Sequence, residues 1–129
     1  MPARYSIDQE RRIVYSSAWD VLTYEDCLGH QQALLADPRF DPTFSQLIDF
    51  TAVTHTTLTT AQIRGLAVAS IFAADARRVM VTPSPFFFGL GRMFSMMREI
   101  VGERGLLIVR THEEAVQALG LTQPEPTLV

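Results

Sequence analysis

Short apolar runs alternate with longer, helix-like stretches over most of the chain, and this alternation limits the fold more than any other feature. The runs QLIDF (46–50), RRVMVT (77–82) and LLIVR (106–110) are bounded by turn residues, as buried strands are. Strands that alternate with helices connect through right-handed crossovers. We therefore expect these strands to lie parallel in one sheet, with the helices packed on it.

The chain opens with a different pattern. RYSID (4–8) and RIVYSSAW (12–19) alternate between apolar and polar residues and are separated by a short polar segment, which predicts an antiparallel hairpin. The predicted order is β-β-α-β-α-β-α-β-α, an α/β fold with a mixed, mostly parallel sheet of about five strands. We expect one domain over residues 1–120 and a flexible tail over 121–129, which contains two prolines.

Three helix starts carry capping residues. Thr23 precedes the first helical stretch, with acidic residues in the turn that follows. Thr59 and Thr111 are followed at the third position by Gln62 and Glu114, the pattern of a capping box. The periodicity predicts that the helix after Thr59 covers TAQIRGLAVASIFAA (60–74).

PSPFFFGLGRMFSMM (83–97) is the most unusual stretch of the sequence. Ser84 and Pro85 suit the N-cap and the first position of a helix. At about 100° per residue, a broad apolar face is centred on Leu90. The other members of this face are Phe86, Phe87, Met93, Phe94, Met97, Ile100 and Val101.

The sequence of this helix excludes a membrane span and a phosphate loop, and it leaves two interpretations open. It is too short and too charged to span a membrane, and its Gly-x-Gly lies inside the helix, where no phosphate loop forms. One interpretation is a helix that packs on the sheet. The other is an apolar ligand groove or a homodimer interface, for which Phe88, Met93 and Met96 are the candidate residues.

Composition narrows the classes of partner and the compartment. The net charge is −3 and the basic residues are scattered, which argues against nucleic acid. The single cysteine, Cys27, excludes an internal disulfide, and the N-terminal residues contain no apolar signal core. We therefore expect a cytoplasmic protein without a membrane span.

The sequence contains no recognisable catalytic or metal-binding motif. Its histidines, His30, His55 and His112, share no metal-ligand spacing, and no nucleophile motif accompanies them. We expect no metal, no cofactor and no catalytic residues, and hence a protein that is not an enzyme.

The main polar concentration is DFTAVTHTTLTT (49–60), which contains six threonines and leads from a strand into a helix. Ligands gather at the carboxyl edge of parallel strands. The candidate edge residues are Asp49, Thr51, Thr82, Ser84 and Thr111. A phosphate or another anion at a helix N-terminus gains from the helix dipole, so Thr57, Thr59 and Thr60 are candidate phosphorylation or anion sites. The alternative is that these threonines satisfy loop backbone and cap helices.

The element order and the stretch LIDFTAVTHTTLTTAQIRGLA (47–67) resemble the STAS-like fold of bacterial anti-sigma-factor antagonists, the SpoIIAA-like group. Leu47 to Val53 resemble the family strand vvlDlsgv, and DPRFDPTF and FGLGRMF resemble segments of its short stand-alone members. In the antagonists a serine in a D-S-S-G-like turn accepts a regulatory phosphate. The corresponding residues here are 56–61, TTLTTA, which contain neither that serine nor the glycine.

Two functions follow as hypotheses. The resemblance implies a non-catalytic regulatory module that binds a protein partner and is switched by phosphorylation at Thr57, Thr59 or Thr60. The alternative is a carrier or sensor of an apolar small molecule or lipid, with a groove beside helix 85–101.

Overall fold

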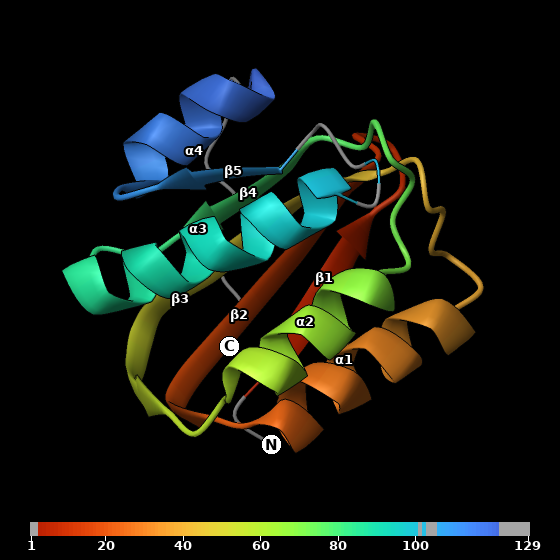
Figure 1. Ribbon diagram of the computed structural model, residues 1–129. Helices are drawn as coiled ribbons and strands as arrows, with labels where there is room; N and C mark the ends of the chain where they lie inside the picture. Colours follow the sequence, from red (N-terminus) through yellow and green to blue (C-terminus); the bar gives the residue numbers. More distant parts are fainter. Residues whose placement is uncertain (1–2, 101, 103–105, 122–129) are drawn as a thin grey trace.

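The protein is seen here as a computed structural model that describes residues 3–100, 102 and 106–121. Its elements follow the predicted order (Figure 1). They are β1 (Ala3–Asp8), β2 (Ile13–Leu22), α1 (Tyr24–Ala36), β3 (Ser45–Thr56), α2 (Thr60–Val68), β4 (Arg78–Val81), α3 (Pro85–Ile100), β5 (Leu106–Val109) and α4 (His112–Leu119). The predicted tail lies outside the described residues, apart from Leu121.

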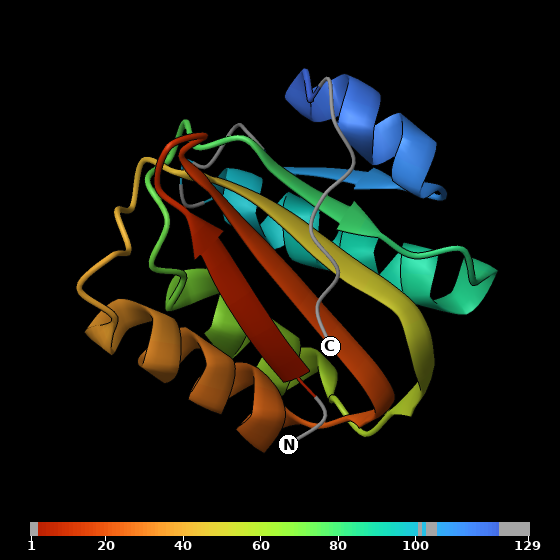
Figure 2. The same ribbon diagram turned by 180° about the vertical axis from the view of Figure 1, so that it is seen from behind.

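The five strands form one sheet in the order β1-β2-β3-β4-β5. β1 and β2 pair antiparallel, and every later pair is parallel, which confirms the predicted mixed sheet. Figures 1 and 2 show α1, α2 and α3 on one face of this sheet and α4 on the other. The sheet is therefore buried on both faces where α3 and α4 overlap it, as parallel sheets usually are.

Side chains on alternate strand positions form two cores. Tyr15, Leu47 and Val79 face α4 and pack with Ala115. The positions between them face the other three helices, where Val14 packs with Leu34 and Phe44, and Ile48 with Met80 and Ile108. Because strand side chains alternate, a polar residue at one of these inward positions enters the layer between the sheet and α1–α3.

Helix capping follows the prediction. The hydroxyls of Thr23, Thr59 and Thr111 each accept a hydrogen bond from the backbone N–H three residues on. Thr59 and Gln62 form the complete capping box. Gly120 ends α4 in the left-handed conformation, with φ of 67°, that glycine adopts most easily.

Three sequence expectations are wrong: where α2 ends, how much of α3 is buried, and where β3 ends. α2 ends at Val68 instead of continuing to residue 74, because the chain turns so that Phe72 and Ala76 enter the core with Val14 and Leu34. On α3, Phe86 is 64% exposed and Ile100 is 84% exposed. The first turn of α3 reaches beyond the sheet (Figure 1). The apolar face predicted around Leu90 therefore assigns too much of the helix to the core. Val101 lies outside the described residues.

The third error concerns β3, which continues to Thr56 instead of ending at Phe50. Its second half pairs with β2 alone, through two register shifts at which β3 carries the extra residues. Such bulges bend a strand, and β3 curves visibly around the end of the sheet (Figure 1). The segment predicted as a threonine-rich loop is therefore strand over Asp49–Thr56, and only residues 57–59 link it to α2.

Candidate functional site

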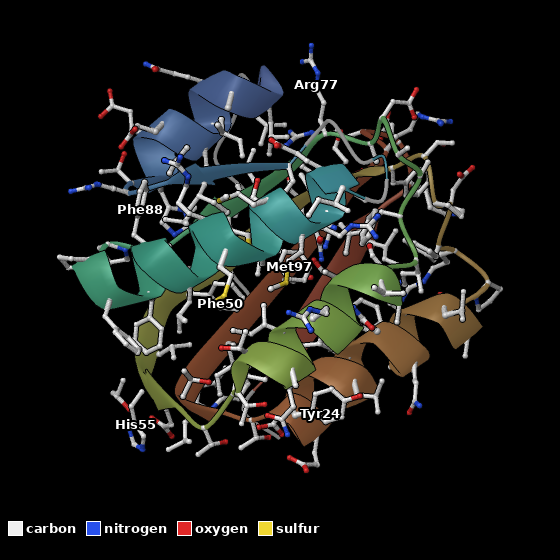
Figure 3. The ribbon with its side chains drawn as sticks, viewed as in Figure 1. Tyr24, Phe50, His55, Arg77, Phe88 and Met97 are labelled. Atoms are coloured by element: carbon white, nitrogen blue, oxygen red, sulfur yellow. The ribbon has the colours of Figure 1, made fainter. Side chains whose placement is uncertain are left out.

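A cavity of about 150 Å³ lies between the sheet and the three helices α1, α2 and α3. Strands β2, β3 and β4 form its floor, and α1, α2 and α3 supply its walls. Figure 3 shows Phe50, one of the lining residues, on the helix-covered face of the sheet beneath α3. The site is thus built from the same layer of inward-facing strand positions that forms the second core.

Most of the cavity wall is apolar. α3 contributes Phe87, Leu90 and Phe94, and α2 contributes Ile63 and Leu66. Gly91 brings α3 close to the sheet, because a Cβ there would lie 3.3 Å from the Ile108 side chain. The remaining apolar lining comes from Ala18, Leu22, Leu34, Ile48, Phe50, Val53, Leu58, Ile71, Phe72 and Met80, together with Ala3. Such a wall favours an apolar ligand.

A connected group of polar side chains interrupts this wall. Arg78 Nε donates to Gln46 Oε1 at 3.0 Å, and Gln46 Nε2 donates to Ser16 Oγ at 3.1 Å. His30 Nε2 lies 2.9 Å from the same Ser16 oxygen, and Arg78 Nη1 donates to Ser70 Oγ at 3.3 Å. We call Ser16, His30, Gln46 and Arg78 the polar cluster; all four line the cavity.

The polar cluster is deeply buried. Ser16, Gln46 and Arg78 are each less than 5% exposed. The Arg78 guanidinium carbon lies 4.5 Å from the ring centroid of Phe72 and 6.0 Å from that of Phe94, so two aromatic rings flank its charge. Burying polar groups costs free energy unless they are hydrogen-bonded, and charge–dipole networks in a low dielectric are strong. The cluster is therefore a hydrogen-bonded polar part of an otherwise apolar wall.

The environment sets the protonation of two side chains on α1. Burial, and then the positive charge of Arg78, lower the pKa of His30 to about 4. Burial, and then the charge of Asp26, raise the pKa of Cys27 to about 12. At neutral pH the imidazole is thus uncharged and the thiol is protonated. Neither group is poised as an acid, a base or a nucleophile.

Thr82 adds one more polar atom to the cavity. It is 1% exposed, and its Oγ1 has no hydrogen-bond partner among the described residues. Thr82 follows β4 at the same inward spacing as Arg78 and Met80, and it lines the cavity. An unsatisfied buried hydroxyl costs about 1–3 kcal/mol, which a ligand that hydrogen-bonds to it would recover.

On the opposite face of the sheet, Asp49 connects β3 to α4. Its Oδ2 lies 2.9 Å from His112 Nε2, and its Oδ1 accepts from the Thr51 backbone N–H at 2.8 Å. Hydrogen bonds from Thr51, and then the contact with His112, outweigh burial and lower the pKa of Asp49. Thr111, which caps α4, is the neighbour of His112. This contact ties α4 to the sheet.

Comparison of the sequence with protein-family models and with curated proteins gives no match. Solved structures do match. One is an uncharacterised protein of the DUF3478 family, described as having a SpoIIAA-like fold, from Shewanella loihica PV-4. It is 16% identical, the alignment covers 91% of this chain and 93% of that one, and the TM-score is 0.57. The chain has a SpoIIAA-like fold.

A second match is the anti-sigma factor antagonist SpoIIAA in its unphosphorylated form, at 17% identity. The alignment covers 92% of this chain and 97% of that one, with a TM-score of 0.45. The match to the protein from Shewanella loihica confirms the resemblance drawn from the sequence as a resemblance of fold.

Within this SpoIIAA-like fold the candidate phosphorylation residues lie away from the polar cluster. Thr57, Thr59 and Thr60 are exposed at the far end of the curved half of β3. Figure 3 shows His55 near this end, far along β3 from the labelled Phe50. None of the three threonines lines the cavity, although Thr56 and Leu58 beside them do. As phosphorylation or anion sites they stay a prediction.

The candidate edge residues divide between the two faces of the SpoIIAA-like sheet. Asp49 contacts His112, the neighbour of Thr111, on the α4 side, whereas Thr82 lines the cavity on the other side. Thr51 is exposed, and the Ser84 carbonyl accepts from the Phe88 N–H at the start of α3. These residues do not form one site, because Asp49 and Thr82 lie on opposite faces of the sheet.

The groove residues predicted on α3 do not line the cavity, whose lining from this helix is Phe87, Leu90, Gly91 and Phe94. Phe88 packs beside Ile48, Met80 and Ile108, and the Arg110 guanidinium carbon lies 4.6 Å from its ring centroid. Met93 is half-buried and Met96 is 59% exposed. The groove beside this helix therefore lies on the face that carries Leu90.

Two further searches of the described part of the chain concern other classes of site. No group of His, Cys, Asp or Glu side chains in residues 3–100, 102 and 106–121 could hold a metal ion. Over the same residues, no helix combines the length and apolar character that crossing a bilayer requires.

Sequence reasoning missed the polar cluster. Gln46 and Arg78 occupy strands predicted from apolar runs, Ser16 occupies a strand predicted from alternation, and nothing in these segments marks the three residues as partners. The available signal was register: Gln46 and Arg78 are polar residues at inward positions of adjacent strands and are paired directly. A polar residue at such a position needs a partner or a ligand.

Proposed function

We propose that this protein is a non-catalytic binding module that holds a small, mainly apolar molecule in the cavity between its sheet and α1–α3. The observation that carries the proposal is the composition of the wall, an apolar surface with one buried, hydrogen-bonded polar cluster. This combination is typical of small-molecule sites, where apolar contacts provide affinity and a few fixed polar groups provide orientation.

The volume decides the size of the ligand. A cavity of about 150 Å³ is large enough for benzene, whereas sites for drug-sized molecules measure about 300–1,000 Å³. A long acyl chain exceeds this volume and would extend beyond the cavity. The alternative drawn from the sequence, a carrier or sensor of an apolar small molecule or lipid, is therefore narrowed in this proposal to a small aromatic or short-chain molecule.

The protonation states support a binding role over a catalytic one. The raised pKa of Cys27, about 12, keeps its thiol protonated, and the lowered pKa of His30, about 4, keeps its imidazole neutral. Catalytic cysteines and histidines are normally tuned toward neutral pH. We therefore assign the polar cluster to ligand orientation.

A cavity-filling variant tests the proposal. Ala18 is buried and lines the cavity, so Ala18→Leu places three additional carbon atoms in it. Ala52 is exposed on the adjacent strand, and Ala52→Leu is the matched control. We expect toluene to raise the Tm of the wild type and of the control, and to have little effect on Ala18→Leu. An equal rise in all three proteins would place toluene elsewhere, and no rise in any would contradict the function.

A second candidate function is binding of a protein partner, as a regulatory module. It is supported by large apolar side chains that are exposed on two helices in contact, α2 and α3. They are Val68 (66%), Met96 (59%) and Ile100 (84%). A homodimer is one such complex. Sedimentation of the wild type and of a Met96→Glu, Ile100→Glu variant tests it, with loss of dimer expected in the variant and a monomeric wild type contradicting it.

Phosphorylation near α2 remains part of this second candidate. Thr59 is exposed and caps α2, so a phosphate on its hydroxyl would lie at the helix N-terminus, where the dipole favours negative charge. Intact mass of protein purified from its native host, followed by peptide mapping, tests this. The switch predicts a phosphate on residues 57–60, and an unmodified chain under all growth conditions would contradict it.

A further inference from the structure

We propose that the ligand of the cavity is a small neutral molecule with one hydroxyl group, a phenol or an alcohol, and that this hydroxyl hydrogen-bonds to Thr82. The inference rests on the function proposed above, because it assigns the chemical class of the molecule that the same cavity takes. It follows from three features: the unpartnered hydroxyl of Thr82, the aromatic side chains at its end of the cavity, and the position of charge in the lining.

The backbone of Thr82 is fixed, but its hydroxyl has no partner. The Thr82 N–H donates to the Val109 carbonyl at 3.0 Å, and the residue follows β4 at the inward spacing of Arg78 and Met80. Thr82 is 1% exposed and lines the cavity, and among the described residues nothing hydrogen-bonds to its Oγ1. Native proteins satisfy most buried groups of this kind. The cavity is the space from which a ligand supplies the missing hydrogen bond.

The polar cluster, by contrast, is already hydrogen-bonded internally. Gln46 bonds to both Arg78 and Ser16. The Ser16 hydroxyl oxygen also lies 2.9 Å from His30 Nε2. Thr82 is four positions after Arg78, a distance of about 13 Å along an extended strand. The polar cluster and Thr82 are therefore separate parts of the wall, and a hydrogen bond from a ligand gains most at Thr82.

Aromatic side chains surround the Thr82 end of the cavity. Phe94 flanks the Arg78 guanidinium, and α3 begins at the end of the sheet at which β4 stops (Figure 1). Phe87, two helical turns before Phe94, therefore lies toward Thr82. Phe87 and Phe50 pack against the same buried residues, and both line the cavity. A small apolar body attached to the ligand hydroxyl thus meets two aromatic rings, which pack favourably with it.

The position of charge in the lining favours a neutral ligand. The charged side chains among the described lining residues are Arg78, about 13 Å from Thr82 along the strand, and Asp26 on α1. α1 packs on β1 and α2, and the Asp26 carboxylate accepts from the Thr23 hydroxyl at 2.7 Å. An ion at Thr82 would therefore be buried without a partner, which is strongly disfavoured.

A hydroxyl is the neutral group that matches Thr82 best. The threonine hydroxyl has one donor and two acceptor sites, and a ligand hydroxyl both donates and accepts. A phenol or an alcohol is also uncharged at pH 7, since a phenolic pKa is about 10. The cavity volume of about 150 Å³ limits the body of the ligand to about the size of one ring.

Titrations with phenol and toluene test the inference, because the two probes have nearly the same shape and exchange a hydroxyl for a methyl group. Thr82→Val makes the same exchange in the protein. We expect Thr82→Val to weaken phenol binding relative to toluene binding by about fivefold to tenfold, through loss of one hydrogen bond. Thr82→Ser keeps the hydroxyl, and Thr57→Val makes the exchange at an exposed position outside the cavity, so both controls should keep the wild-type ratio.

The unliganded protein gives a second measurement. Valine has no hydroxyl to leave unsatisfied, so we expect Thr82→Val to have a higher Tm than the wild type without ligand, and Thr57→Val to have an unchanged Tm. A lower Tm of Thr82→Val would show that the hydroxyl already has a partner inside the protein, and it would overturn the inference.

The outcomes separate the two proposals. Toluene binding with the same phenol-to-toluene affinity ratio in the wild type and Thr82→Val would overturn the hydroxyl contact and leave the proposed function standing. Binding of neither probe would contradict both. If Thr82→Val does not fold, nuclear Overhauser effects between the Thr82 methyl group and bound phenol decide. Contacts with the ring protons beside the hydroxyl are expected, and contacts with the opposite ring proton alone would overturn the assignment.

Discussion

Arg78 is the side chain around which the cavity wall is organised. It hydrogen-bonds to Gln46 on the adjacent strand and to Ser70 after α2, and it stacks on rings from two further segments. A buried charge of this kind costs several kcal/mol in desolvation unless its surroundings compensate for it. It stands at the start of β4, in a strand otherwise made of valine and methionine, so its hydrogen bonds and ring contacts supply that compensation.

His30 gives a prediction at the same scale. Its pKa is about 4 in the folded protein and near 6.5 when unfolded, so the unfolded chain binds more protons between these values. The lowered pKa therefore leaves the free energy of unfolding unchanged above pH 6.5. As the pH falls from 6.5 toward 4, the unfolded chain takes up a proton that the folded protein does not, and the free energy of unfolding decreases. The groups around His30 include Arg78, Ser16 and the Tyr5 ring, whose centroid lies 5.7 Å away.

Urea unfolding of the wild type and of His30→Gln over this pH range isolates the effect, because the carboxylates titrate in both proteins. On going from pH 7 to pH 4.5, we expect the free energy of unfolding of the wild type to fall by about 2 kcal/mol more than that of His30→Gln. Parallel pH profiles would contradict a lowered His30 pKa.

At the scale of elements, helix caps are the most predictable feature. Thr59→Ala removes the acceptor for the Gln62 N–H and should cost about 1 kcal/mol in the free energy of unfolding. Thr57→Ala, two residues earlier at an exposed position, is the matched control and should change it by less than about 0.5 kcal/mol. Chemical denaturation measures both. Equal effects would contradict the capping role of Thr59.

α3 gives a second prediction for an element. Gly89 and Gly91 are both inside the helix, where alanine is favoured over glycine by about 1 kcal/mol. A Cβ at Gly89 meets no atom within 4 Å, whereas a Cβ at Gly91 meets Ile108 at 3.3 Å. We expect Gly89→Ala to raise the free energy of unfolding by about 0.5–1 kcal/mol and Gly91→Ala to raise it less or lower it. A larger gain at Gly91 would show that α3 packs less tightly than described.

What the sequence could predict also differs among the elements. Capping residues and apolar runs are local signals, so the order of elements, the helix starts and the parallel pairing followed from them. The length of β3 did not, because four of residues 51–56 are polar and this segment pairs only with β2 beyond the rest of the sheet. The end of α2 was also not predicted by a local signal, since burial of Phe72 outweighs the helical preference of the residues before it.

At the scale of the whole molecule, the site depends on register. Ser16, Gln46 and Arg78 are separated in sequence by 30 and 32 residues and meet only because three strands are aligned. The sequence alone could indicate a groove beside α3, but it could not indicate which face of that helix or which strand side chains complete it. The SpoIIAA-like fold supplies the layer, and this chain's own polar residues form the cluster on which the proposed binding site rests.

The central claim is that the layer between the sheet and α1–α3 is a ligand site, and methyl-detected NMR of the wild type during a toluene titration tests it most directly. We predict saturable shifts of the Ile63, Leu66 and Met80 methyl groups, which line the cavity, with no change at the exposed Leu35. Unchanged spectra at saturating toluene, or shifts confined to the exposed Val68, Met96 and Ile100, would contradict the claim.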